Sequence, residues 1–271
     1  MSNAQQHNDH PFHLLNPSPW PLTASIGAFI GAIGAVHWFQ DRADKTWLSV
    51  GAVIVLATAF MWWRDVVREA RRDHAHTTEV RHGLRLGMAL FIASEVMFFV
   101  AFFWAFFNGA LGTNPSISQW PPAGIEPLHT WSLPFINTLI LLSSGATVNW
   151  AHHGVRTGHT RQVVLGLLAS VVLGAVFLTL QSVEYGEATF KFTEGVYPSV
   201  FYMATGFHGF HVFVGVCFLS VCAIRAAQGQ FKPEQHVGFE AAAWYWHFVD
   251  VVWLFLFVWI YWWGNSQSVM P

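Results

Sequence analysis

The chain has 271 residues, of which 54% are hydrophobic and 10% are charged, and its formal net charge is −2. Soluble domains carry about 25% charged residues, so this composition excludes an ordinary soluble protein and indicates an integral membrane protein. The 13 Lys and Arg residues do not form the basic surface that nucleic-acid binding requires, so we expect no nucleic-acid partner.

Seven long apolar runs predict transmembrane helices, because about 20 apolar residues cross a bilayer as a helix. The expected spans are residues 22–39, 47–63, 84–111, 133–150, 162–183, 197–224 and 239–263. The first span carries Gly27, Gly31 and Gly34, whose spacing suits close helix packing. We expect one all-α membrane domain over 1–271. It comprises a tail with helices one and two in 1–63, a basic inner loop in 64–82, helices three to seven in 83–264, and a tail in 265–271.

The distribution of Lys and Arg predicts the orientation, because inner loops carry the excess of these residues. With the N-terminus inside, most of the 13 basic residues fall on the inner side: Arg64, Arg68, Arg71, Arg72, Arg81, Arg85, Arg156, Arg161, Arg225 and Lys232. Arg42, Lys45 and Lys191 fall outside. We therefore expect the N-terminus inside and the C-terminus outside.

Ionisable side chains within the predicted spans are candidates for a mid-membrane polar network, because a charge at mid-bilayer costs about 2.5–3.5 kcal/mol and needs an interior partner. They are Glu95, His208, His211, Glu240, His247 and Asp250. Helical rise puts most of them near one depth. His247 and Asp250, three residues apart, share a helix face and can bond each other or a neighbouring helix. A proton relay and a hydrogen-bond network that locks helices together both remain open.

Metal binding is a separate hypothesis, since the chain has 15 histidines, including the neighbouring pair His152 and His153. Membrane di-iron enzymes use clusters of closely spaced histidines. However, His152 and His153 fall at the inner end of the fourth span, whereas His208 and His211 fall at mid-depth, more than about 10 Å away along the membrane normal. We therefore expect no metal site. No haem-attachment motif or thiolate cluster for copper is present in the sequence.

Basic and aromatic residues next to the second span form a candidate lipid-binding site, because basic residues between transmembrane helices bind anionic head groups. The candidates are Trp63, Arg64, Arg68, Glu69, His76 and Arg225. The general excess of positive charge on inner loops explains the same residues without a specific lipid. On the outer side, Glu184, Glu187 and Glu194 are either a patch for a basic partner or solvated loop residues, and Glu184 could pair locally.

The segment from Phe239 to Leu256, FEAAAWYWHFVDVVWLFL, resembles the last helix of the subunit III family of cytochrome c oxidases, within the haem–copper oxidases. Further stretches resemble the same family, and together they extend over nearly the whole chain. They are NPSPWP at 16–21, WWRDVVRE at 62–69, SEVMFF and FWAF at 94–106, WAHH at 150–153, and MATGFHGFHV at 203–212.

The resemblance implies seven helices. The first two and the last five form two groups, and the V-shaped cleft between the groups is filled by structural phospholipids. It implies a complex with subunits I and II that reduces oxygen to water with electrons from cytochrome c and pumps protons. Haem and copper would lie in partner subunits, and this subunit, with no redox centre and no catalytic residue, would stabilise subunit I and support proton uptake. In the family, the carboxyl matching Glu95 reacts with hydrophobic carbodiimides. The lipid head-group contacts match Arg64, Arg68, His76 and Arg225.

Several alternatives stay open at this point. Subunit III of a quinol oxidase resembles the same family, although closeness of match favours cytochrome c. A stand-alone membrane enzyme with a histidine-bound di-metal centre belongs to another class, and a proton-coupled transporter through Glu95, His211 and Asp250 belongs to a third. The topology fits a bacterial inner membrane or a mitochondrial inner membrane equally, and a respiratory supercomplex is possible in both.

Overall fold

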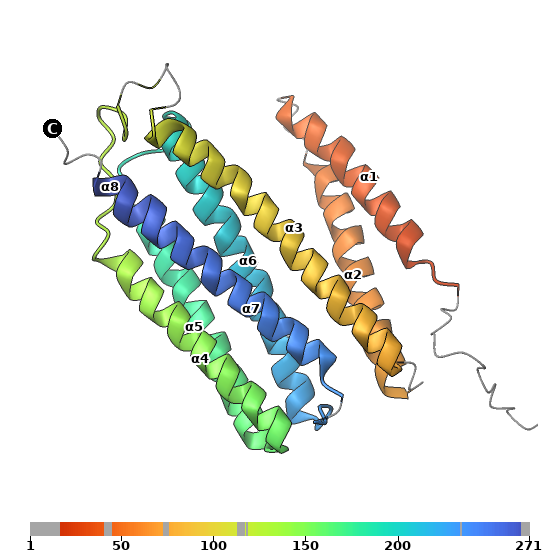
Figure 1. The fold of residues 1–271 in the computed structure, drawn as a ribbon. Coiled ribbons are helices and arrows are strands. Elements are labelled where there is room, and N and C mark those ends of the chain that lie inside the picture. The colour runs from red at the N-terminus through yellow and green to blue at the C-terminus, as the bar shows by residue number, and fades with distance from the viewer. Residues whose placement is uncertain are drawn as a thin grey trace, which may run out of the picture. The chain divides into compact units, whose positions relative to one another are not determined.

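The computed structural model describes residues 17–40, 45–72, 76–112, 117, 119–233 and 235–266, and its long elements are helices (Figure 1). In chain order these are α1 Trp20–Phe39, α2 Thr46–Arg72, α3 Thr78–Ala110, α4 Leu133–Thr157, α5 Thr160–Glu187, α6 Val196–Ala227 and α7 Val237–Leu256. A π-helical segment, η1 Phe257–Trp263, and the short α8 Gly264–Ser266 continue α7. The chain divides within α3, after Leu84, into two compact units, which are described separately below.

Six of these helices are long and apolar enough to cross a membrane, namely α1, α2, α3, α5, α6 and α7 with η1. The seventh, α4, has 25 residues, which is enough to span about 30 Å of hydrocarbon, but its apolar stretch is less hydrophobic than those of the other six. Several of its polar side chains form hydrogen bonds with α7, namely Thr138, Ser144 and Asn149.

The predicted inner loop at 64–82 is shorter in the structure, because both neighbouring helices continue into it. Helix α2 extends to Arg72 and α3 begins at Thr78, while residues 73–75 lie outside the described part of the chain. Arg64, Arg68 and Glu69 are therefore on the last turns of a helix and not in a loop. A membrane helix can continue past the hydrocarbon. Its last turns then lie outside the hydrocarbon and can carry charged residues while they remain helical.

Proline and glycine account for several helix ends. Pro21 and Pro134 lie in the first turns of α1 and α4, where the missing N–H would have no partner within the helix. Gly158 ends α4 in the left-handed conformation with φ +76°, and the N–H of His159 then bonds the Gly154 carbonyl at 2.8 Å. This glycine cap lets α5 begin two residues later.

The first unit consists mainly of α1 and α2, which approach closely through glycines. A Cβ atom on Gly34 would lie 2.1 Å from the Leu48 backbone nitrogen, and one on Gly51 would lie 2.3 Å from the Gly31 nitrogen. The close packing predicted for the glycines of the first span is therefore confirmed. Trp20 Nε1 donates to Asp65 Oδ2 at 2.9 Å, which ties the start of α1 to the far end of α2.

The second unit has its core along α7, which packs on α4 and α6. Trp246 and Trp253 of α7 are fully enclosed, and their indole N–H groups donate to Ser144 Oγ and Thr138 Oγ1 of α4, each at 2.9 Å. A Cβ on Gly174 of α5 would lie 2.7 Å from the Trp246 ring. Aromatic size and glycine recesses thus fix how α7 fits among its neighbours.

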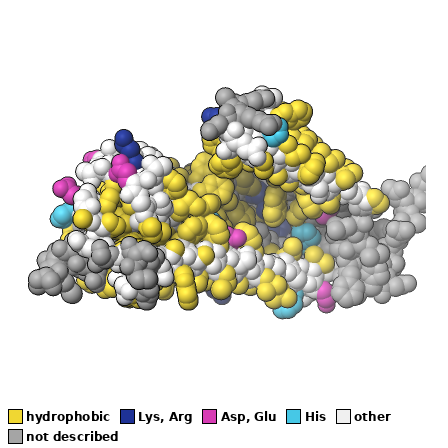
Figure 2. All heavy atoms as spheres, turned by 90° about the horizontal axis from the view of Figure 1, so that it is seen from above, with side chains coloured by type: hydrophobic (Ala, Val, Ile, Leu, Met, Phe, Trp, Pro, Cys, Tyr) yellow, Lys and Arg dark blue, Asp and Glu magenta, His cyan; other side chains and the backbone are white. Residues whose placement is uncertain are grey.

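Large hydrophobic side chains also cover much of the outside of the structure, and Figure 2 shows few charged side chains on the face seen from above. Leu90, Trp104, Val172 and Phe210 are each at least 60% exposed. Exposed apolar area on this scale is typical of helices that face lipid rather than water.

Candidate functional site

A cluster of charged and histidine side chains lies at the start of α7 in the second unit. Glu240 accepts two hydrogen bonds from Arg85 of α3, with Nε to Oε2 at 2.7 Å and Nη2 to Oε1 at 3.1 Å. His236, four residues earlier, places Nε2 3.4 Å from Glu240 Oε1, and His152 of α4 contacts the His236 ring. The bidentate ion pair connects α3 to α7, although these helices are far apart in sequence.

The same cluster offers three potential metal ligands. One ligand atom from each of His152, His236 and Glu240 lies within 4.8 Å of the other two, and two imidazoles with a carboxylate are a donor set that zinc accepts. His236 Nδ1 lies 3.1 Å from the Lys232 carbonyl, to which it donates a hydrogen bond. The other ring nitrogen, Nε2, is then the atom that could bind a metal. Arg85 donates one hydrogen bond to each oxygen of Glu240, so a metal at this cluster would share the carboxylate with the guanidinium group.

His247 and Asp250 of α7 contact each other, as their spacing predicts. His247 Nδ1 lies 3.3 Å from Asp250 Oδ2, and His247 Nε2 lies 2.9 Å from Oδ1 of Asn149 on α4. Gly145 of α4 provides the space for this carboxyl, because a Cβ there would lie 2.4 Å from Asp250 Oδ2. The histidine thus bridges two helices through polar contacts on both sides of its ring.

Glu95 of α3 and His211 of α6 form a second interhelical pair. His211 Nε2 lies 2.9 Å from Glu95 Oε2, and its Nδ1 lies 2.6 Å from the Phe207 carbonyl. Because a carbonyl oxygen only accepts, Nδ1 carries a hydrogen, and the Nε2–Oε2 contact then needs one shared proton. The pair is therefore suited either to hold a proton or to lock α3 onto α6.

His208, the remaining predicted member, contacts none of the others through a hydrogen bond. It is 1% exposed, neither ring nitrogen has a hydrogen-bond partner among the described residues, and its ring stacks on Trp253 with centroids 5.1 Å apart. The Phe177 ring meets it edge-on. The predicted mid-membrane residues thus separate into the Glu95–His211 pair, the His247–Asp250 pair, Glu240 at the start of α7 with Arg85, and His208 alone.

The candidate lipid residues lie in both units. In the first unit Trp63, Arg64 and Arg68 are exposed, and Arg64 Nη2 lies 3.6 Å from Asp65 Oδ1. Glu69 and His76 are half-buried. In the second unit Arg225 donates to Gln230 Oε1 at 3.1 Å and lies over the Phe231 ring. The first three side chains thus present charge and an indole ring at the end of α2.

The Glu184 carboxyl is buried near the end of α5, at the other end of the second unit from Glu240. Glu184 of α5 is 1% exposed; its Oε1 accepts from Tyr261 Oη at 2.6 Å and from Gln181 Nε2 at 3.3 Å. The prediction that Glu184 pairs locally is confirmed. A cavity of about 220 Å³ between this carboxyl and the loop of residues 126–134 is lined by polar and apolar groups.

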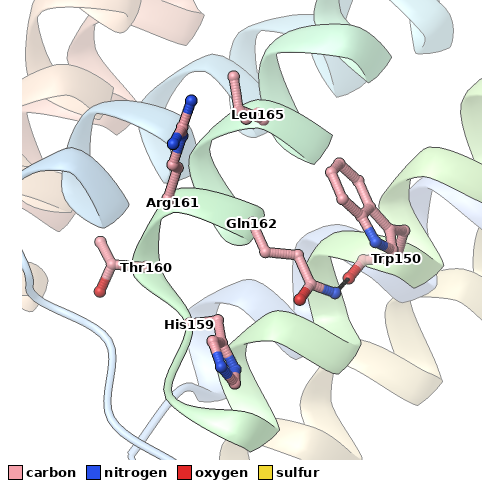
Figure 3. A pocket seen from close by; sticks show the side chains of 6 residues that line it. All are labelled: Trp150, His159, Thr160, Arg161, Gln162 and Leu165. Carbon is pink, nitrogen blue, oxygen red and sulfur yellow. Dashed lines mark hydrogen bonds between the residues drawn. The ribbon is translucent and has the colours of Figure 1, made fainter.

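A second, shallower cavity of about 450 Å³ lies at the turn between α4 and α5 (Figure 3). Its lining is Trp150, His159, Thr160, Arg161, Gln162 and Leu165. Gln162 Nε2 donates to the Trp150 carbonyl at 2.8 Å, and Figure 3 shows this side chain reaching across to α4 while Arg161 points elsewhere. None of the predicted site residues lines this cavity.

The sequence indicated several of the ionisable residues in these groups, but not the side chains that contact them. Arg85, His152 and His236 complete the Glu240 cluster, and Asn149 completes the His247 group. The four-residue spacing of His236 and Glu240 was a usable signal for one of them. The other three lie on α3 and α4 and not on α7, and no spacing along the chain reports which helices are neighbours.

The comparison with known proteins gives one consistent result. The sequence model of the family described as cytochrome c oxidase subunit III matches residues 10–265. A relative from Marchantia polymorpha, named cytochrome c oxidase subunit 3, is 55% identical over 259 residues, with 95% of this chain and 98% of the relative covered. Proteins of the same name from Arabidopsis thaliana and Formosania lacustris are 54% and 50% identical over 260 residues, covering 94% and 96% of this chain and 97% and 99% of theirs.

Six long apolar helices together with these relatives indicate a multi-pass inner-membrane protein. The match extends over both compact units and over every residue of the polar groups described above. The chain belongs to the cytochrome c oxidase subunit III family and is the subunit III of an oxidoreductase complex.

Proposed function

We propose that this chain is an accessory core subunit beside a catalytic subunit I, in a complex that reduces oxygen to water with electrons from cytochrome c and pumps protons. The observation that carries this role is that the polar pairs described above connect one spanning helix to another. Glu95 bonds His211, Arg85 bonds Glu240, and Trp246 bonds Ser144. Such contacts hold a bundle in one arrangement.

The proposal places haem and copper in partner subunits and no redox centre in this chain. The surroundings of His208 and His211 support this assignment, because neither histidine is free to bind a haem iron. His208 is enclosed by Trp253 and Phe177, so a porphyrin cannot approach its ring, and both ring nitrogens of His211 already have partners. Cytochrome c and subunit II enter the proposal through the complex, as does membership of a respiratory supercomplex.

We also propose seven spans, with the N-terminus inside and the C-terminus outside. Helix α4 is the added span, since its 25 residues cover the hydrocarbon and much of its polarity is buried in the bundle. The orientation rests on the excess of Lys and Arg on the proposed inner side. A bacterial inner membrane and a mitochondrial inner membrane both fit, and the lipid-filled cleft between the helix groups stays a prediction.

Anionic phospholipid is the proposed ligand of the charged end of α2. Replacing Arg64 and Arg68 together by glutamine should reduce the anionic phospholipid that co-purifies with the complex, because each basic residue near a charged head group contributes about 1 kcal/mol. Mass spectrometry of lipids extracted from the purified oxidase measures the loss, which we expect to be at least several-fold. Arg161, at the α4–α5 turn, provides the control; an equal loss in Arg161→Gln would show general charge attraction instead of a site.

The proposed contribution to activity is indirect, through proton uptake and protection of subunit I. Lipid and packed helices beside subunit I would exclude water and stiffen its helices. Oxidase depleted of this chain should therefore take up protons more slowly and lose activity sooner during turnover than intact oxidase. Stopped-flow proton uptake and the decay of oxygen consumption measure both. Unchanged uptake and an unchanged active lifetime would contradict the proposal, and adding back the chain should restore both.

A further inference from the structure

Three side chains that can bind a metal come together where α7 begins, although two distant parts of the chain supply them. His236 is the residue before α7 and Glu240 lies in its first turn, whereas His152 belongs to α4. One ligand atom of each lies within 4.8 Å of the other two. The sequence-based expectation of no metal site compared His152 only with His208 and His211, so it did not weigh this combination.

The hydrogen bond on the far side of the His236 ring determines which kind of atom faces Glu240. His236 Nδ1 lies 3.1 Å from the Lys232 carbonyl oxygen, and because a carbonyl only accepts, Nδ1 carries a hydrogen. In the neutral ring Nε2 then has a lone pair and no hydrogen. This nitrogen lies 3.4 Å from Glu240 Oε1, which is also an acceptor. Two acceptors this close need a cation between them, which is either a proton or a metal ion.

The length of this contact favours a metal ion over a proton. A hydrogen bond between charged partners measures about 2.7–2.9 Å, which is well below the 3.4 Å between His236 Nε2 and Glu240 Oε1. Ligand atoms of a tetrahedral zinc site with bonds of about 2.0–2.1 Å are about 3.3–3.4 Å apart. The contact therefore already has the length of one edge of such a site. His152 can complete a second and a third edge with a movement of roughly 1.5 Å or less, since its ligand atom lies within 4.8 Å of both others.

Arg85 weakens the charge of the Glu240 carboxylate but leaves room for a metal. Its Nε donates to Glu240 Oε2 at 2.7 Å, and its Nη2 donates to Oε1 at the longer distance of 3.1 Å. A carboxylate oxygen has two lone pairs, so Oε1 can bind a metal beside His236 while Arg85 holds Oε2. Carboxylates that bind metals are commonly oriented by such hydrogen bonds. The Arg85 side chain is 42% exposed and that of Glu240 16%, so an ion can reach the carboxylate from the surface.

We propose that His152, His236 and Glu240 form a binding site for Zn²⁺, with water as the fourth ligand. Two imidazole nitrogens disfavour Ca²⁺ and Mg²⁺, which bind oxygen ligands, whereas zinc takes two histidines and one carboxylate and keeps an open fourth position. The bound ion would tie the segment that precedes α7 to α4. Zinc has no redox chemistry, so the site goes beyond the proposed function and places no redox centre in this chain.

Anomalous diffraction at the zinc edge, from crystals of the intact oxidase complex soaked with Zn²⁺, locates the ion directly. We expect a peak about 2.0–2.1 Å from a ring nitrogen of His152, from His236 Nε2 and from Glu240 Oε1. Zinc found only at other places, or no zinc on this chain, would overturn the proposal. Because this measurement uses the unaltered chain, it does not depend on the folding of any variant.

Equilibrium dialysis of the purified complex against Zn²⁺, followed by metal analysis, measures the affinity. His152→Gln and His236→Gln should each weaken binding by at least about tenfold, because loss of even an outer partner of a metal ligand costs 10–100-fold. His153→Gln is the matched control, since His153 is the exposed neighbour of His152. An equal loss in this control, or no loss in either ligand variant, would indicate adventitious surface binding and overturn the site.

The haem content per chain, measured on the same samples, keeps this inference separate from the proposed function. We expect each variant to keep the haem content of the unaltered complex, which shows that the subunit still assembles. Unaltered chain isolated with no haem would reject the proposed function and leave the zinc site standing. Full haem content without zinc at the three ligands would reject the zinc site alone.

Discussion

Replacing Trp246 by alanine is expected to have the largest effect of any single substitution in the second unit, about 3–5 kcal/mol of its free energy of unfolding. Trp246 is fully buried, and it is positioned by contacts from three other helices. Its indole donates to Ser144 of α4, and its ring fills recesses at Gly174 of α5 and Gly215 of α6. Alanine would remove the hydrogen bond and leave a cavity that rigid helices cannot close.

Unfolding in mixed micelles of mild detergent and dodecyl sulfate measures this loss. Trp244→Ala is the matched control, because Trp244 is two residues away in the same helix and 40% exposed. We expect the control to shift the transition by less than about 1 kcal/mol, as surface substitutions do. Equal shifts for the two tryptophans would show that the core described around α7 does not stabilise the subunit.

The second large effect is expected from Arg85→Ala, which would leave the Glu240 carboxylate without its bidentate partner. Hydrogen bonds to charged groups contribute about 1.5–3 kcal/mol, and Glu240 has little access to solvent, with 16% of its side chain exposed. The ion pair also joins α3 to α7. We therefore expect weaker attachment of α3, measured as faster hydrogen–deuterium exchange in the α3 segment after Arg85, together with a lower unfolding free energy.

Two further variants distinguish loss of the pair from loss of packing. Arg85→Lys retains the charge but not the fork geometry, so it should recover only part of the stability. In the double variant with Glu240→Gln, the uncompensated charge is gone, so the combined loss should be smaller than the sum of the single losses. Strict additivity would mean that Arg85 and Glu240 do not interact across the helices.

The sequence was sufficient to predict the membrane class and the six long apolar helices, because apolar length is a local property of the chain. The roles of the candidate site residues stay predictions. The sequence also predicted the contact of His247 with Asp250, since three-residue spacing in a helix fixes their proximity. It did not predict that Glu240 and His211 belong to different groups. Depth along a helix is readable from residue counts, but the rotation of one helix against another is decided by packing.

The helix ends show the same limit. Apolar runs predicted that the second span ends near Trp63, whereas α2 continues to Arg72. Hydropathy reports where hydrocarbon ends, while helix formation depends on backbone hydrogen bonds that continue into the aqueous layer. An apolar run likewise predicted a span at 133–150, but polar residues keep α4 below the hydropathy of the other six long helices. The contacts with α7 explain two of these polar residues, because Ser144 and Thr138 accept hydrogen bonds from the indole N–H groups of Trp246 and Trp253. The sequence of α4 alone does not show these donors.

The proposed role of this chain is to stabilise a haem–copper enzyme without holding a redox centre itself. Gentle solubilisation, capture of the tagged chain, and a reduced-minus-oxidised optical spectrum with iron and copper analysis test it directly. We expect haem and copper to co-purify with the captured complex and to be lost when the chain is stripped of its partners. Stoichiometric haem iron or copper that stays with the isolated chain would contradict the account and return the histidines to consideration as ligands.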